Sequence, residues 1–94
     1  MNISVEFAGL SRVLTGARQI SLDLEESETF QDIVCILADR YPSLVGKVIQ
    51  PDGQGLYPSN LFSLNGQRMV QENQMDQSPN EGDRVILMSI LAGG

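Results

Sequence analysis

The sequence contains one segment with clear helical periodicity, and its other periodic segments alternate as β-strands do. The apolar residues of the helical segment recur at i, i+3, i+4, i+7 and i+11, namely Phe30, Ile33, Val34, Leu37 and Tyr41. Thr29 and Asp32 form a variant capping box that begins the helix, and Pro42 ends it because the residue before a proline is disfavoured in helical geometry. We therefore expect one main helix packed against a sheet.

Alternating apolar residues predict strands at residues 3–7 and 20–24 before this helix, and further strands are predicted after it at residues 61–64, 68–70 and 84–91. The first two strands are expected to form a hairpin that is connected by a loop through residues 15–17. Asn65-Gly66 is a strong signal for a second, tighter hairpin. The last segment is a near-continuous apolar run, which is typical of a strand in the middle of a sheet. Residues 43–60 are expected to be mostly loop with a helical turn around 44–49, and residues 71–82 show no clear periodicity.

The composition is that of one globular domain. With 94 residues, 41% of them hydrophobic and 19% charged, the chain is expected to form a single domain over residues 1–94, ending in a flexible tail at residues 91–94. No apolar run approaches the roughly 18 residues that span a bilayer, and the N-terminus lacks a basic region followed by an apolar one. We therefore expect a cytoplasmic protein that does not contact membranes.

The residue types needed for common catalytic and metal sites are nearly absent. The chain has no histidine, and its single cysteine, Cys35, cannot form an internal disulfide. A histidine-dependent triad and a Cys/His zinc site are therefore excluded. Cys35 lies within the helical segment, where we expect a small buried hydrophobe rather than a reactive thiol. Asp52, Asp76 and Asp83 are too scattered to predict a metal site, so the chain is expected to be neither an enzyme nor a metal binder.

The net charge of −6 also restricts the partners. One lysine and five arginines are scattered singly along the sequence, so there is no basic stripe to neutralise phosphates. Nucleic acid is thus an unexpected partner, and a basic protein surface is a better one.

The chain ends in Gly93-Gly94, and we expect the terminal carboxylate itself to be the reactive group. Two residues without a Cβ can enter a channel too narrow for side chains. At an average glycine usage of about 7%, two terminal glycines arise by chance in roughly one chain in two hundred. The alternative is a frayed terminus without function.

Five short elements in order resemble the MoaD/ThiS family of ubiquitin-like sulfur carriers over essentially the whole chain. They are Ile3-Ser4-Val5-Glu6-Phe7, Leu37-Ala38-Asp39-Arg40-Tyr41-Pro42, Leu64-Asn65-Gly66, Glu81-Gly82-Asp83-Arg84-Val85 and Leu91-Ala92-Gly93-Gly94. The resemblance implies an α+β, β-grasp fold, in which a mixed sheet of four to five strands packs on one main helix.

The resemblance also implies a chemistry for the C-terminus. An ATP-dependent activating enzyme of the MoeB/ThiF type adenylates Gly94, and the adenylate is then converted to a thiocarboxylate that donates sulfur to an accepting synthase subunit. Gly93 keeps the approach slim, and Ala92 marks where the channel begins to widen. The chain itself binds no cofactor, because ATP belongs to the partner enzyme.

Three functions stay open at this point. The first is that of a sulfur carrier for molybdopterin biosynthesis, thiamine biosynthesis or cysteine formation. Among such carriers, the long connection after Lys47 favours a protein like MoaD, the small subunit of molybdopterin synthase, or like CysO. A second function is that of a ubiquitin-like modifier joined through Gly94 to target lysines. The ending Leu87-Met88-Ser89-Ile90-Leu91-Ala92 leans toward the eukaryotic ubiquitin-related modifier. The third is a plain binding module with an inert tail.

The last strand also predicts a docking surface. If Val85 and Leu87 face the core, then Ile86, Met88 and Ile90 face the other side of the sheet, which in such folds usually meets solvent. Three apolar residues there, with Leu91 following, predict a partner-binding patch. The alternative is that a loop or residues 71–82 cover them.

Overall fold

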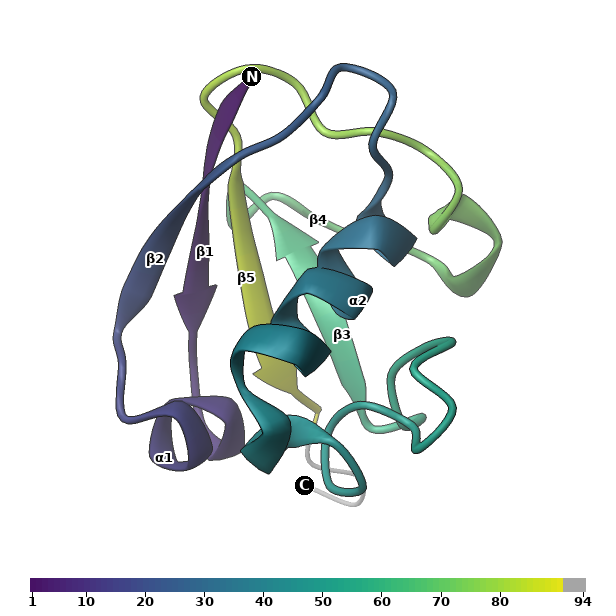
Figure 1. Cartoon of the computed structure of the whole chain (residues 1–94). Coiled ribbons are helices and arrows are strands. Elements are labelled where there is room, and N and C mark those ends of the chain that lie inside the picture. The colour runs from purple at the N-terminus through teal and green to yellow at the C-terminus, as the bar shows by residue number, and fades with distance from the viewer. Residues whose placement is uncertain (91–94) are drawn as a thin grey trace.

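A computed structural model describes residues 1–90 as a five-stranded mixed sheet with one main helix across one face (Figure 1). The strands are β1 (Asn2–Phe7), β2 (Gln19–Asp23), β3 (Asn60–Leu64), β4 (Arg68–Met69) and β5 (Arg84–Ser89). They lie in the order β2-β1-β5-β3-β4, and α2 (Phe30–Arg40) is the main helix. The expected α+β architecture is confirmed, with the last strand in the centre of the sheet.

β5 occupies the centre because the first and last strands of the chain pair in parallel. Val5 lies opposite Val85 in the β1/β5 pair, and both side chains are fully buried. On its other side β5 runs antiparallel to β3, with Leu87 opposite Phe62. A strand bonded on both sides and covered on one face needs the apolar run that the sequence shows.

The core lies between the sheet and the apolar face of α2. Phe30, Ile33, Val34 and Leu37 are at most 1% exposed, as the helical stripe predicts. The rings of Phe30 and Phe62 lie 6.4 Å apart, which joins the start of the helix to β3. Each such side chain contributes about 1.5–3 kcal/mol of burial free energy, so this one interface supplies much of the stability.

The start of α2 is closed by its own cap and by a distant segment. Thr29 Oγ1 accepts from the Asp32 N–H at 3.2 Å, and Asp32 Oδ2 accepts from the Thr29 N–H at 2.8 Å, so both halves of the predicted capping box form. The N–H groups of Phe30 and Gln31 donate to the carbonyls of Gln77 and Met75. Four N–H groups lack partners at a free helix start, and residues 71–82 fold over this end to satisfy two of them.

The Asn65-Gly66 turn forms the predicted hairpin and is tied to the central strand. Asn65 adopts φ 57° and Gly66 φ 69°, values that asparagine and glycine tolerate best. The Asn65 side chain donates to Asp83 Oδ1 at 3.0 Å and accepts from the Arg84 N–H at 2.8 Å. The hairpin therefore fixes the point at which β5 begins.

Residues 9–17 differ from the expected loop, because they contain the short helix α1 (Leu10–Thr15). The helix is held by tertiary contacts: the buried Ser11 hydroxyl donates to the carbonyls of Ala8 at 3.1 Å and Leu87 at 3.0 Å. Gly16 ends it in the left-handed region at φ 69°. Six residues are too few to show helical periodicity, which is why the sequence does not reveal α1.

Residues 43–60 are largely irregular, as expected, but they contribute to the core. The short 3-10 helix at Pro42–Leu44 lies earlier than the predicted turn. Leu44, Val48 and Ile49 are fully buried. None of the helices in the described part of the chain has the length and apolar character that a bilayer crossing requires.

Cys35 is exposed, so the expectation of a buried hydrophobe is wrong. The residue lies on α2 beside the apolar stripe, on the side that faces the loop around Gly53. Its sulfur lies 3.6 Å from the Gly53 carbonyl oxygen and 3.9 Å from Gln31 Nε2. Position within the helix, rather than the apolar character of its sequence neighbours, decides its burial.

The cap of α2 gives the first testable prediction. Thr29→Ala removes the oxygen that accepts from Asp32 and should lower the free energy of unfolding by about 1 kcal/mol. Thr29→Ser keeps that oxygen and should unfold close to the parent protein. Urea denaturation of the three proteins checks this, and an equal loss in both variants would contradict a role for the hydroxyl.

Candidate functional site

The residues expected to carry the tail chemistry, Ala92, Gly93 and Gly94, lie outside the described residues, as does Leu91, which was expected in the partner-binding patch. The structure does describe the base from which they continue. The Ile90 N–H donates to the Ser59 carbonyl at 2.7 Å, and Ser89 Oγ donates to Asn60 Oδ1 at 2.9 Å. The last described residues are thus fixed against the start of β3.

The side chains of β5 divide between the two faces as predicted. Val85 and Leu87 are fully buried beneath α2, whereas Ile86 and Met88 alternate with them, are half-buried and lie on the open face of the sheet. Ile90 continues the open-face series and is 44% exposed. In Figure 1, α2 lies across one face of the sheet, and the open face is the opposite one.

Two residues that the sequence analysis missed extend this surface. Leu61 lies opposite Met88 in the β3/β5 register, and Met69, which is 48% exposed, lies opposite Ser63 on the same face. The five residues that form the open-face patch are Leu61, Met69, Ile86, Met88 and Ile90. Strand alternation places Leu61 on the face opposite to Phe62, so the sequence could have indicated Leu61. The position of Met69 could be found only from its pairing with Ser63 in the β3/β4 hairpin.

Polar residues on β1 and β2 border the patch. Glu6 accepts a hydrogen bond from Arg84 Nε across the two central strands, which gives an ion pair on the open face. Ser4 lies opposite Ser21 on the same face. Residues 71–82 bond to the start of α2, on the other side of the sheet, and so do not cover the patch as the alternative required.

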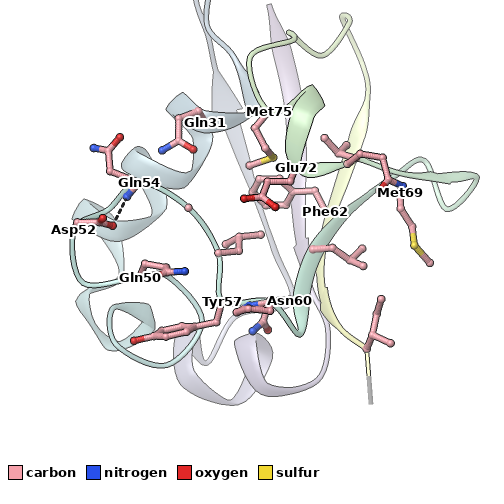
Figure 2. Close-up of a pocket in the computed structure, with 17 residues that line it drawn as sticks. Gln31, Gln50, Asp52, Gln54, Tyr57, Asn60, Phe62, Met69, Glu72 and Met75 are labelled. Carbon is pink, nitrogen blue, oxygen red and sulfur yellow. Dashed lines mark hydrogen bonds between the residues drawn. The ribbon is translucent and has the colours of Figure 1, made fainter. Parts of the chain in front are cut away.

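A groove of about 720 Å³ lies beside β3 and β4, between the loop at residues 50–58 and the segment after β4. Figure 2 shows Gln31, Gln50 and Gln54 on one side, with Phe62 and Met75 toward the other. The side chains that line it are mainly amides and apolar groups. Ile90 belongs to both the groove and the open-face patch, so the end of β5 lies where the two surfaces meet.

No protein-family model and no curated protein sequence matches this chain. Solved structures do match. SAMP1, a small archaeal modifier protein from Haloferax volcanii, is 21% identical over 100% of both chains, with a TM-score of 0.81. Urm1 from Trypanosoma brucei is 29% identical over 99% of this chain and 95% of its own, with a TM-score of 0.69. CysO, in the Amycolatopsis orientalis BexX/CysO complex, is 17% identical over 98% and 99%, also with a TM-score of 0.69.

The chain is a ubiquitin-like β-grasp protein. The β-grasp fold that the resemblance to the MoaD/ThiS family implies is confirmed by these neighbours, which also include a putative molybdopterin converting factor, subunit 1, from Pyrococcus furiosus.

Within residues 1–90, the β-grasp protein gathers no cluster of three His, Cys, Asp or Glu side chains that could hold a metal ion. Cys35 has polar contacts with Gln31 and the Gly53 carbonyl, and neither group can act as the base that activates a thiol.

The division of β5 between two faces predicts different costs for neighbouring substitutions. Leu87→Asp places a carboxylate in the core and should lower the free energy of unfolding by roughly 3–5 kcal/mol. Met88→Asp places it on the open face and should cost about 1 kcal/mol or less. Chemical denaturation measures both, and a larger cost for Met88→Asp would mean that the faces are assigned the wrong way round.

Proposed function

We propose that this β-grasp protein is a sulfur carrier whose Gly94 carboxylate is adenylated by a partner enzyme and converted to a thiocarboxylate. The observation that carries the proposal is the position of β5. The strand is bonded on both sides, borders an apolar docking face, and continues directly into Leu91-Ala92-Gly93-Gly94. The likeness to carrier and modifier proteins supports the general class.

The chemistry needs no catalytic side chain from the carrier. An oxygen of the Gly94 carboxylate attacks the α-phosphorus of ATP, and pyrophosphate leaves with the electrons of the broken P–O bond. A sulfur nucleophile then attacks the carbonyl carbon of the acyl adenylate, a C–S bond forms, and AMP leaves. The partner supplies ATP and its binding site, while Gly93 and Ala92 give the carboxylate a slim approach to it.

The partner in the first step is an activating enzyme of the MoeB/ThiF type, which docks on the open-face patch. After the second step, the thiocarboxylate would donate its sulfur to a sulfur-accepting synthase subunit, and the carrier would then be a small subunit of a sulfurtransferase such as molybdopterin synthase. CysO, which shares this fold, forms a complex with BexX. The sulfur would serve molybdopterin, thiamine or cysteine biosynthesis inside the cytoplasm.

A second candidate function is that of a protein modifier joined through Gly94 to target lysines. The likeness to Urm1 and SAMP1 favours it. Both functions begin with the same adenylate and differ in the nucleophile that receives the acyl group, which is sulfur in one case and a lysine amine in the other.

Intact-mass measurement separates the two functions. After incubation with an activating enzyme of the MoeB/ThiF type from the same organism, ATP and sulfide, the carrier should gain the mass difference between sulfur and oxygen. A chain without Gly94 should fold normally and show no change, because the tail lies beyond the last core residue. An unchanged mass of the parent protein, with an enzyme shown to form adenylates, would overturn the carrier function; an added protein mass in the presence of lysates would favour the modifier.

The docking face gives a further prediction. Met88→Asp puts a charge in the centre of the open-face patch and should weaken binding to the activating enzyme by about 2 kcal/mol or more. Ser21→Asp puts the same charge on the same sheet face, away from the patch, and should leave the affinity close to that of the parent protein. Isothermal titration calorimetry provides the affinities, and equal losses in the two variants would remove the patch as the docking site.

A further inference from the structure

Positive charges that are scattered in the sequence gather at one end of the molecule. The side chains that form this basic end are Arg12, Arg18, Arg40 and Lys47. All four are exposed. They come from four separate segments, so only the fold brings them together.

Two of these residues are placed by the ends of the central strands. The Ala8 N–H donates to the Leu87 carbonyl at 3.0 Å, which holds the start of α1, and therefore Arg12, beside the end of β5. The Phe7 N–H donates to the Arg18 carbonyl at 2.8 Å, so Arg18 lies where β1 ends. Because β1 and β5 are parallel, both strands end at the same edge of the sheet.

The other two residues reach this edge from the helix layer. Arg40 is the last residue of α2, and the ring of Tyr41 next to it packs edge-on against Phe7 with centroids 5.4 Å apart. Ser43 Oγ donates to the Leu14 carbonyl at 2.8 Å and so joins the segment before Lys47 to α1. In Figure 1 the end of α2, α1 and the end of β5 all lie at the lower end of the molecule.

The opposite end of the molecule is acidic. The connections at that end, between β2 and α2 and before β5, carry Asp23, Glu25, Glu26, Glu28, Glu81 and Asp83. The ion pairs found within residues 1–90 join the Met1 amino group to Asp23 and Arg84 to Glu6, so the four cations of the basic end form no ion pair there, although the exposed Asp39 lies beside Arg40 near the end of α2. The net charge of −6 therefore hides a separation of charge along the strand direction.

We propose that the basic end, together with the exposed apolar side chains of Leu10 and Val13, docks on an acidic protein surface of the activating enzyme. This inference rests on the proposed function, because it requires that a partner receives the C-terminus. The net charge of −6 alone predicts a basic partner surface. The positive charges beside the end of β5 predict an acidic partner surface instead. A charge-separated carrier is steered so that its basic end meets an acidic partner first.

A protein fits this end better than a nucleic acid does. Val13 is 78% exposed and Leu10 is 44% exposed, and both lie on the helix that carries Arg12. Exposed apolar side chains among four separated cations suit a protein interface. A nucleic-acid surface would need more cations along a continuous path.

The test replaces each of two exposed arginines with glutamate, and the two substitutions change the net charge by the same amount. Arg18→Glu, at the basic end, should slow association with the activating enzyme by roughly tenfold at low salt and weaken the salt dependence of the rate. Arg68→Glu, at the start of β4, should change the rate less than about twofold. Stopped-flow association and thermal melting are measured for both variants and the parent. Equal slowing by both variants, or by neither, overturns the acidic docking surface even when adenylation proceeds.

A second measurement does not depend on the enzyme, so its failure is separate from a failure of the proposed function. Adding poly-L-glutamate to the isotope-labelled protein at low salt should shift the backbone amide NMR resonances of α1, Arg18, Arg40 and Lys47. Shifts elsewhere, or none, contradict the proposal. Tighter binding of a single-stranded oligonucleotide than of poly-L-glutamate at these residues would identify the wrong class of partner and also overturn it.

Discussion

The parallel pairing of β1 with β5 is the constraint on which the rest of the structure depends. Antiparallel neighbours can be joined by a short turn, but parallel neighbours need a long crossover. Between these two strands the chain forms α2 on one face of the sheet, and burial of Val5 and Val85 against the helix layer holds the pair together. Since the helix layer covers one face of the sheet, the core forms there and the other face stays open.

The same pairing brings two functional features to one edge. Parallel strands end together, so the end of β1 with α1 lies beside the end of β5. The open-face patch extends to this edge at Ile90, and the basic end lies at the same edge. An apolar face and a charged edge meet at one strand end, which gives a partner both an adhesive surface and an orientation.

The sequence predicts the elements that local physics controls. The stripe of α2, its capping box and the Asn65-Gly66 turn depend on near neighbours, and all three are confirmed. The central position of β5 follows from its apolar run. The outward direction of Ile86 and Met88 follows from strand alternation once Val85 and Leu87 are placed in the core.

Features that depend on distant contacts could not be predicted in this way. α1 exists because Ser11 bonds to the carbonyl of Leu87, which lies far away in the sequence. Met69 joins the patch only through pairing with β3. The basic end is the clearest case, because its cations are isolated in the sequence and adjacent only after folding.

The position of β5 also determines how the protein responds to mechanical load. A partner that grips the C-terminus pulls along the axis of β5, in the middle of the sheet rather than at its edge. The backbone bonds to β1 and β3 lie across this direction and would have to shear together, whereas an edge strand can be peeled away one bond at a time. The fold would therefore resist a pull along β5 better than a fold whose last strand lies at a sheet edge.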